Sequence, residues 1–128
     1  MQHTIIQRIF KDKKIFFDFI ENELYLNATK TAKEFGKRLD SWKKSPQTIE
    51  YINVLSAYTN RDNGDLMKVI FGGNDKNVQG TWLHPKLIIP FSRWLSAEFS
   101  VWCDLTIEDI LSQRFAPKIS LKEKLELE

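Results

Sequence analysis

A cluster of basic side chains between residues 29 and 44 is the strongest chemical signal in the sequence. This segment contains six lysine or arginine residues and two acidic ones, a net charge of +4, whereas the whole chain has a net charge of +2. Long cationic side chains neutralise phosphates, and serine can hydrogen-bond a phosphate or a base edge. The segment offers these candidate contacts to nucleic acid: Lys37, Arg38, Ser41, Lys43 and Lys44. A solvated helix face explains the same charges without a ligand.

A second candidate region is the polar segment 72–80, which begins and ends with glycine. Apolar segments on both sides indicate strands, so we expect a hairpin with a long polar tip. Such a tip suits insertion along a groove of nucleic acid, and a flexible solvent loop is the alternative. Because the segment joins two strands, it lacks the helix N-terminus on which phosphate-binding loops depend. The tip adds these candidate contacts: Asn74, Lys76, Asn77 and Gln79.

Residue types that commonly catalyse reactions or bind metals are sparse. One cysteine and two histidines exclude an intramolecular disulfide and a structural zinc site rich in Cys and His. The sequence contains no nucleophile elbow, Walker loop, HExxH motif or dinucleotide fingerprint. We expect Cys103 to be a buried thiol and His84 to cap or pack a helix start. The expectation is a protein that is not an enzyme, with no catalytic residues, no cofactor and no metal site.

The composition is typical of one globular domain. The chain has 128 residues, of which 42% are hydrophobic and 28% charged, close to the averages for soluble proteins. It contains no apolar run long enough for a transmembrane helix and no signal peptide at the N-terminus. These features predict a cytoplasmic protein without a membrane partner.

The elements that must position the candidate residues begin with strands. Segments 15–20 and 24–26 are apolar and form a predicted hairpin, with 4–10 as a further strand. Asn27 can cap a short helix that ends at Gly36, where glycine can adopt a left-handed conformation.

Two more helices follow, over 39–44 and from Pro46 to about Tyr58. Apolar residues recur at every third position of the longer one, and we interpret them as a core-facing stripe. The stripe contains Ile49, Ile52, Leu55 and Tyr58, with Tyr51 and Val54 beside them.

The remaining elements are a second hairpin, 67–71 with 81–83, and two helices. The first helix is predicted to start near Pro85. Pro90 lies inside it and predicts either a kink at that position or a helix that starts later in the chain. The second starts near Ser96, and a second cap at 106–109 is expected to split it. Its expected inward residues are Phe99, Trp102, Cys103 and Leu105. Strand pairs separated by helices predict an α+β fold with two β-hairpins packed against about five helices.

Several motifs occur in a characteristic order. They are YLNATK at 25–30, GKR at 36–38, Trp42, GGN at 72–74, GTWLHPKL at 80–87 and WLSAEF at 94–99. Together they resemble the KilA-N domain of bacteriophages, bacteria and large DNA viruses, over roughly residues 15–110. The segments 27–29 and 79–82 are also similar to the APSES domain of fungal transcription factors.

The resemblance implies a winged-helix-like, DNA-binding domain of a phage or bacterial regulatory protein. By position, segment 37–44 leads into the DNA-facing helix and segment 74–79 corresponds to the wing. The implied organisation is an N-terminal strand or arm at 1–14, the domain at 15–112 and a tail or linker at 113–128.

Two other functions compete with duplex DNA binding. The first is an antirepressor-type interaction module that captures another regulatory protein without binding DNA, suggested by the acidic segment 94–112. A second copy of the chain, forming a homodimer, is a further possible partner. The other function is a nuclease, which would need clustered carboxylates, and only Asp62, Asp65 and Asp75 lie near the second hairpin.

Overall fold

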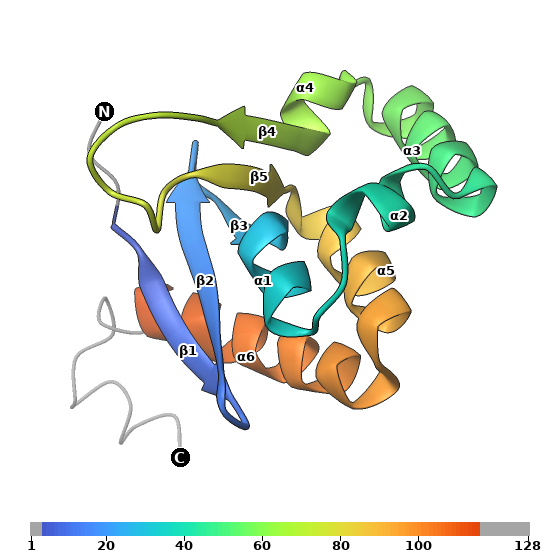
Figure 1. The fold of residues 1–128 in the computed structure, drawn as a ribbon. Helices are drawn as coiled ribbons and strands as arrows, with labels where there is room; N and C mark the ends of the chain where they lie inside the picture. Colours follow the sequence, from blue (N-terminus) through green and yellow to red (C-terminus); the bar gives the residue numbers. More distant parts are fainter. Residues whose placement is uncertain (1–3, 116–128) are drawn as a thin grey trace, which may run out of the picture.

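The structure is a computed structural model, and it describes residues 4–115 (Figure 1). Within this range the chain forms five strands and six helices. The strands are β1 (Ile6–Phe10), β2 (Lys13–Ile20), β3 (Glu23–Asn27), β4 (Met67–Ile70) and β5 (Gly80–Leu83). The helices are α1 (Ala28–Glu34), α2 (Leu39–Lys43), α3 (Pro46–Thr59), α4 (Asn63–Leu66), α5 (Pro85–Leu95) and α6 (Ala97–Phe115). The predicted α+β class is confirmed.

All five strands belong to one antiparallel sheet with the order β1-β2-β3-β5-β4. Both predicted hairpins are present, and the further strand is β1. The hairpins do not stand apart, because β3 pairs with β5 through Leu26↔Leu83 and Asn27↔Trp82. This junction satisfies backbone groups that two separate hairpins would leave free, and a two-stranded hairpin alone is only marginally stable.

The main core lies between the sheet and helices α1, α5 and α6. Phe17, Leu26 and Leu83 of the sheet are fully buried there, together with Phe91 of α5 and Phe99 of α6. The opposite face of the sheet has a smaller cluster of Phe16, Ile20, Tyr25 and Trp82. None of the helices between residues 4 and 115 is both long and apolar enough to span a bilayer.

Helix α1 begins and ends as predicted. The Asn27 side-chain oxygen accepts a hydrogen bond from the Lys30 backbone N–H at 3.1 Å. Gly36 follows the helix with a φ of +67°, a conformation that favours glycine.

Helix α3 corrects the prediction of a core-facing stripe. Of its 14 residues, only Thr48 and Ile52 are buried. Leu55 is half-buried and packs against the core, whereas the other four predicted members, Ile49, Tyr51, Val54 and Tyr58, are exposed. The helix lies at the edge of the molecule and packs mainly against α2 and α4 (Figure 1).

The last two helices differ from the prediction in their boundaries. Helix α5 starts at Pro85 and includes Pro90, so the later start is wrong. Because Lys86 is exposed, water can hydrate the carbonyl that Pro90 leaves without a donor. Helix α6 is continuous from Ala97 to Phe115, so the predicted split at 106–109 is also wrong.

The inward face of α6 is set by its helical period. Phe99, Cys103 and Ile110 are buried and Trp102 is half-buried, whereas Leu105 is exposed, against expectation. Residues separated by three, four or seven positions lie on the same side of a helix. The buried residues therefore form one side of α6, and the helix can pack against the sheet without being interrupted. Most of the predicted tail, from residue 116 onward, lies outside the described residues.

Candidate nucleic-acid interface

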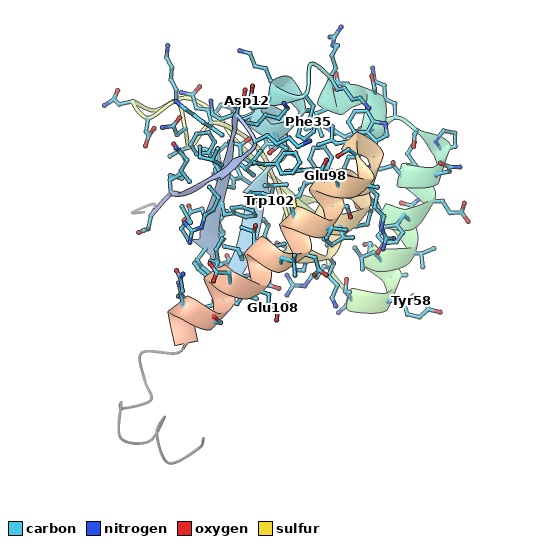
Figure 2. The ribbon with its side chains drawn as sticks, turned by 90° about the horizontal axis from the view of Figure 1, so that it is seen from below. Asp12, Phe35, Tyr58, Glu98, Trp102 and Glu108 are labelled. Carbon is cyan, nitrogen blue, oxygen red and sulfur yellow. The ribbon has the colours of Figure 1, made fainter. Side chains whose placement is uncertain are left out.

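The predicted contacts at 37–44 and those in the β4–β5 loop lie on one side of the molecule, with α1 between them. In Figure 1 the β4–β5 loop lies at the left, α1 in the middle and α2 at the right. Figure 2 shows the same three segments along its upper edge. The structure therefore places residues 37–44 and the β4–β5 loop on a common face, and α1, which contains the first part of the basic segment, lies between them.

Helix α2 is short and is anchored by one aromatic side chain. It has five residues, of which only Trp42 is buried. The Trp42 ring packs edge-to-face on Phe91 of α5, with ring centroids 5.2 Å apart. This contact holds α2 against the body of the protein and leaves Ser41 and Lys44 in solvent.

The basic side chains around α2 differ in their exposure and in the contacts that hold them. Arg38 is at the N-cap position, is exposed and makes no side-chain cap hydrogen bond. Lys43 is half-buried and Lys44 is exposed. The Lys37 ammonium lies 4.9 Å from the centroid of the Trp94 ring and 3.4 Å from the Trp94 carbonyl oxygen. Lys37 is thus held against α5, where its charge still contributes to the face.

The β4–β5 loop is braced at its base by hydrogen bonds. The Trp82 indole N–H donates to the Val78 carbonyl at 2.7 Å, and the Asn27 amide donates to the Gln79 carbonyl at 2.9 Å. The Gln79 amide donates to the Gly73 carbonyl at 3.2 Å. Gln79 therefore closes the loop, a structural role that the sequence did not reveal. The other candidates, Asn74, Lys76 and Asn77, are exposed at the tip.

Gly80 lets α1 and the loop approach each other. Its φ is +129°, and a Cβ at this position would lie 2.8 Å from the Asn27 side-chain oxygen. The Thr29 hydroxyl accepts a hydrogen bond from the Thr81 backbone N–H at 2.9 Å. The 27–29 and 80–82 motifs are therefore adjacent in space, and together they fix the first turn of α1 against β5.

Two further cations on this face, Lys30 and Lys33 of α1, were not among the predicted contacts. They lie three residues apart on the side of α1 opposite buried Ala28 and Ala32, which is a signal that helical spacing contains. Both line a hollow of about 360 Å³ between α1 and the β4–β5 hairpin, which we call the α1–β4 hollow. Its other lining residues include Thr29, Val69, Phe71 and Gln79.

His84 and Cys103 have the structural roles that the sequence predicted. His84 is 2% exposed, and its Nδ1 accepts a hydrogen bond from the Lys86 N–H at 3.1 Å. Its Nε2 lies 2.8 Å from a Glu23 carboxylate oxygen. Burial lowers the pKa of His84, and the Glu23 charge opposes that shift. Burial raises the pKa of the Cys103 thiol to about 12, so it stays protonated and unreactive at neutral pH.

The three carboxylates considered for a nuclease have separate local roles. The Asp62 carboxylate accepts a hydrogen bond from the Asp65 N–H at 2.8 Å and caps α4. Asp65 lies 3.5 Å from the Lys68 ammonium, and Asp75 accepts from the Asn77 N–H at 2.9 Å. Among residues 4–115, no three His, Cys, Asp or Glu side chains form a group that could hold a metal ion.

Curated viral proteins resemble this chain. A putative KilA-N domain-containing protein, L4, of Acanthamoeba polyphaga mimivirus is 35% identical over 102 residues, which cover 79% of this chain and 22% of that protein. A second such protein of the same virus, L32, is 34% identical over 70 residues, covering 55% of this chain and 19% of that protein. The chain thus spans about a fifth of the length of these relatives. No solved structure matches it.

The family comparison agrees with the order of motifs along the chain. The family model for the KilA-N domain matches residues 9–113, a range that runs from β1 to the last turns of α6. The 27–29 and 80–87 motifs lie within this range. They supply the Thr29–Thr81 hydrogen bond that joins α1 to β5 and the His84 cap at the start of α5. The chain belongs to the KilA-N domain family.

Proposed function

We propose that this domain binds duplex DNA through the face formed by α1, α2 and the β4–β5 loop. The observation that carries the proposal is the gathering of lysines and arginines from three separate segments on one side of the molecule. Membership of the KilA-N domain family supports it, because that resemblance implies DNA binding. Such a face attracts the phosphate backbone and orients the protein before any base is read.

The proposed contacts divide into two classes. Arg38, Lys43 and Lys44 around α2 and Lys76 in the loop neutralise phosphates. Lys37, which lies over Trp94, adds its charge from a fixed position. Ser41 and Asn77 are exposed polar side chains that can reach a sugar or a base edge, with α2 directed to the major groove and the loop along an adjacent groove.

Fluorescence anisotropy with duplex DNA across a salt series tests the proposal. We expect log affinity to fall linearly with log salt, with a slope of roughly −3 to −6. The double substitution Lys43→Ala, Lys44→Ala should weaken binding to every sequence and reduce the slope by about two. Lys68→Ala is the matched control, because the strand register places Lys68 on the sheet face opposite α1. Absence of binding near 50 mM salt would overturn the proposal.

An antirepressor-type interaction module is the second candidate function. The exposed apolar residues of α3 favour it, since Tyr58 is 88% exposed and Tyr51 and Val54 are about half exposed. If wild-type protein fails to bind DNA, this face becomes the first place to seek a protein partner.

The biological setting is part of the same proposal. We infer a binding role rather than catalysis, in a regulatory protein that acts in the cytoplasm. The curated relatives come from a large DNA virus. We therefore add large DNA viruses to phages and bacteria as proposed sources of such a regulator.

A further inference from the structure

Phe71 is an exposed aromatic side chain at the foot of the β4–β5 loop. It is 85% exposed and belongs to neither hydrophobic cluster. Phe71 directly follows β4 and lines the α1–β4 hollow together with Val69. The register Val69↔Thr81 places Val69 on the face that carries α1. Because β4 is an edge strand of the sheet, both apolar side chains lie open beside α1.

The α1–β4 hollow combines this apolar surface with positive charge. Val69 and Phe71 lie on its hairpin side, and Lys30 and Lys33 on its α1 side. No acidic side chain is among its lining residues. The Thr29 hydroxyl accepts from the Thr81 N–H, and a hydroxyl that accepts one hydrogen bond can also donate one. An aromatic platform beside two cations and a hydroxyl matches a base with its flanking phosphates.

The position of Phe71 places it near the DNA that the loop would contact. Gly72 and Gly73 follow it with φ values of +73° and +84°, so the chain turns away from the strand directly after the ring. The β4–β5 loop therefore extends beyond Phe71 (Figure 1). DNA that lay along the loop and α1 would pass over the hollow, which residues of both segments line.

We propose that the α1–β4 hollow is a nucleobase-stacking site, in which the Phe71 ring stacks on a base of the bound DNA and Lys30 and Lys33 neutralise its neighbouring phosphates. This inference rests on the proposed function and deepens it. Single-stranded and duplex DNA can both offer the same ligand, the flat face of a base. A single strand exposes this face directly, and a duplex exposes it where a side chain separates two stacked base pairs.

The test measures the affinity of the Phe71→Ala variant for a twelve-nucleotide thymidine single strand and for a duplex, each across a salt series. We expect a loss of about five- to 150-fold on at least one of them, with an unchanged salt slope, because stacking removes no counterion. Phe71→Trp should retain affinity. Lys30→Ala with Lys33→Ala should instead reduce the slope by about two.

Tyr58→Ala is the matched control, because Tyr58 is 88% exposed and lies on α3. It should bind as the wild type does, and every variant should show the wild-type melting temperature. A loss confined to the single strand identifies an unpaired base as the ligand, and a loss on the duplex identifies an opened step. If Phe71→Ala binds both DNAs as wild type does while the Lys43, Lys44 variant is weakened, the stacking site is wrong and the proposed function stands. If the wild type binds neither DNA at low salt, both are overturned.

Discussion

Helices α3 and α5 start alike and are packed differently. Each begins with a capping side chain followed by proline: Ser45 and Pro46 for α3, His84 and Pro85 for α5. Helix α5 buries five residues between the sheet and its neighbouring helices, whereas α3 buries two. Local sequence thus starts both helices equally well, and burial depends on what lies beside each helix.

The spacing of the apolar residues is one cause of the difference. In α5 they fall four, seven and eight positions after Leu87, which keeps them on one side of a helix with 3.6 residues per turn. In α3 they recur every three positions, and each step falls about 60° short of a full turn. Tyr58 therefore lies about 180° around the helix from Ile49, and the predicted stripe cannot face a single core. A strict repeat of three is not evidence of one buried helix face.

The largest contrast between the two helices should appear in stability. Phe91→Ala removes a fully buried ring that packs on Trp42, and it should lower the free energy of unfolding by about 3–5 kcal/mol. Tyr58→Ala, on the exposed end of α3, should change it by less than about 0.5 kcal/mol. Urea unfolding followed by circular dichroism measures both. Equal losses would show that α3 is buried in solution, for example against a second copy.

A smaller effect should come from the cap of α3. Ser45 accepts a hydrogen bond from the Thr48 N–H at 3.1 Å, and Ser45→Ala should destabilise the protein by about 1 kcal/mol. Because tertiary contacts hold α3 weakly, the loss should be concentrated there. Amide hydrogen exchange should speed up in α3 and remain nearly unchanged in α5. Uniform acceleration across both helices would show that α3 does not open separately from α5.

The smallest effect concerns the cap of α5 and depends on pH. Burial lowers the pKa of His84 in the folded state, so the unfolded chain binds a proton more readily. The contribution of neutral His84 to stability should be fully present above the pKa of histidine in the unfolded chain, about 6.5, and should decline as the pH falls below that value. His84→Asn keeps a capping side chain but removes this titration, so its stability should fall less between pH 7 and 5. If the stability of both proteins depends on pH in the same way, the Glu23 charge fully offsets the effect of burial on the pKa of His84.

Features determined by neighbouring residues were predictable from the sequence. The Asn27 cap, the Gly36 helix end, the β2–β3 hairpin and the cap at His84 each depend on residues a few positions apart. The order of motifs was sufficient to indicate the KilA-N domain. Short-range hydrogen bonding and backbone sterics determine these features almost independently of the rest of the chain.

Only the tertiary structure decided how these pieces meet. The pairing Leu26↔Leu83 joins the hairpins across 57 residues, and no local pattern encodes it. The same long-range pairing brings α1 against the second hairpin, which places Lys30 and Lys33 beside Phe71 and lets the Asn27 amide donate to the Gln79 carbonyl at the base of the loop. Exposure of α3 also depends on its place at the edge of the molecule. A sequence specifies which faces of an element are apolar, but burial and shared sites arise from contacts between distant segments, whose geometry depends on the whole fold.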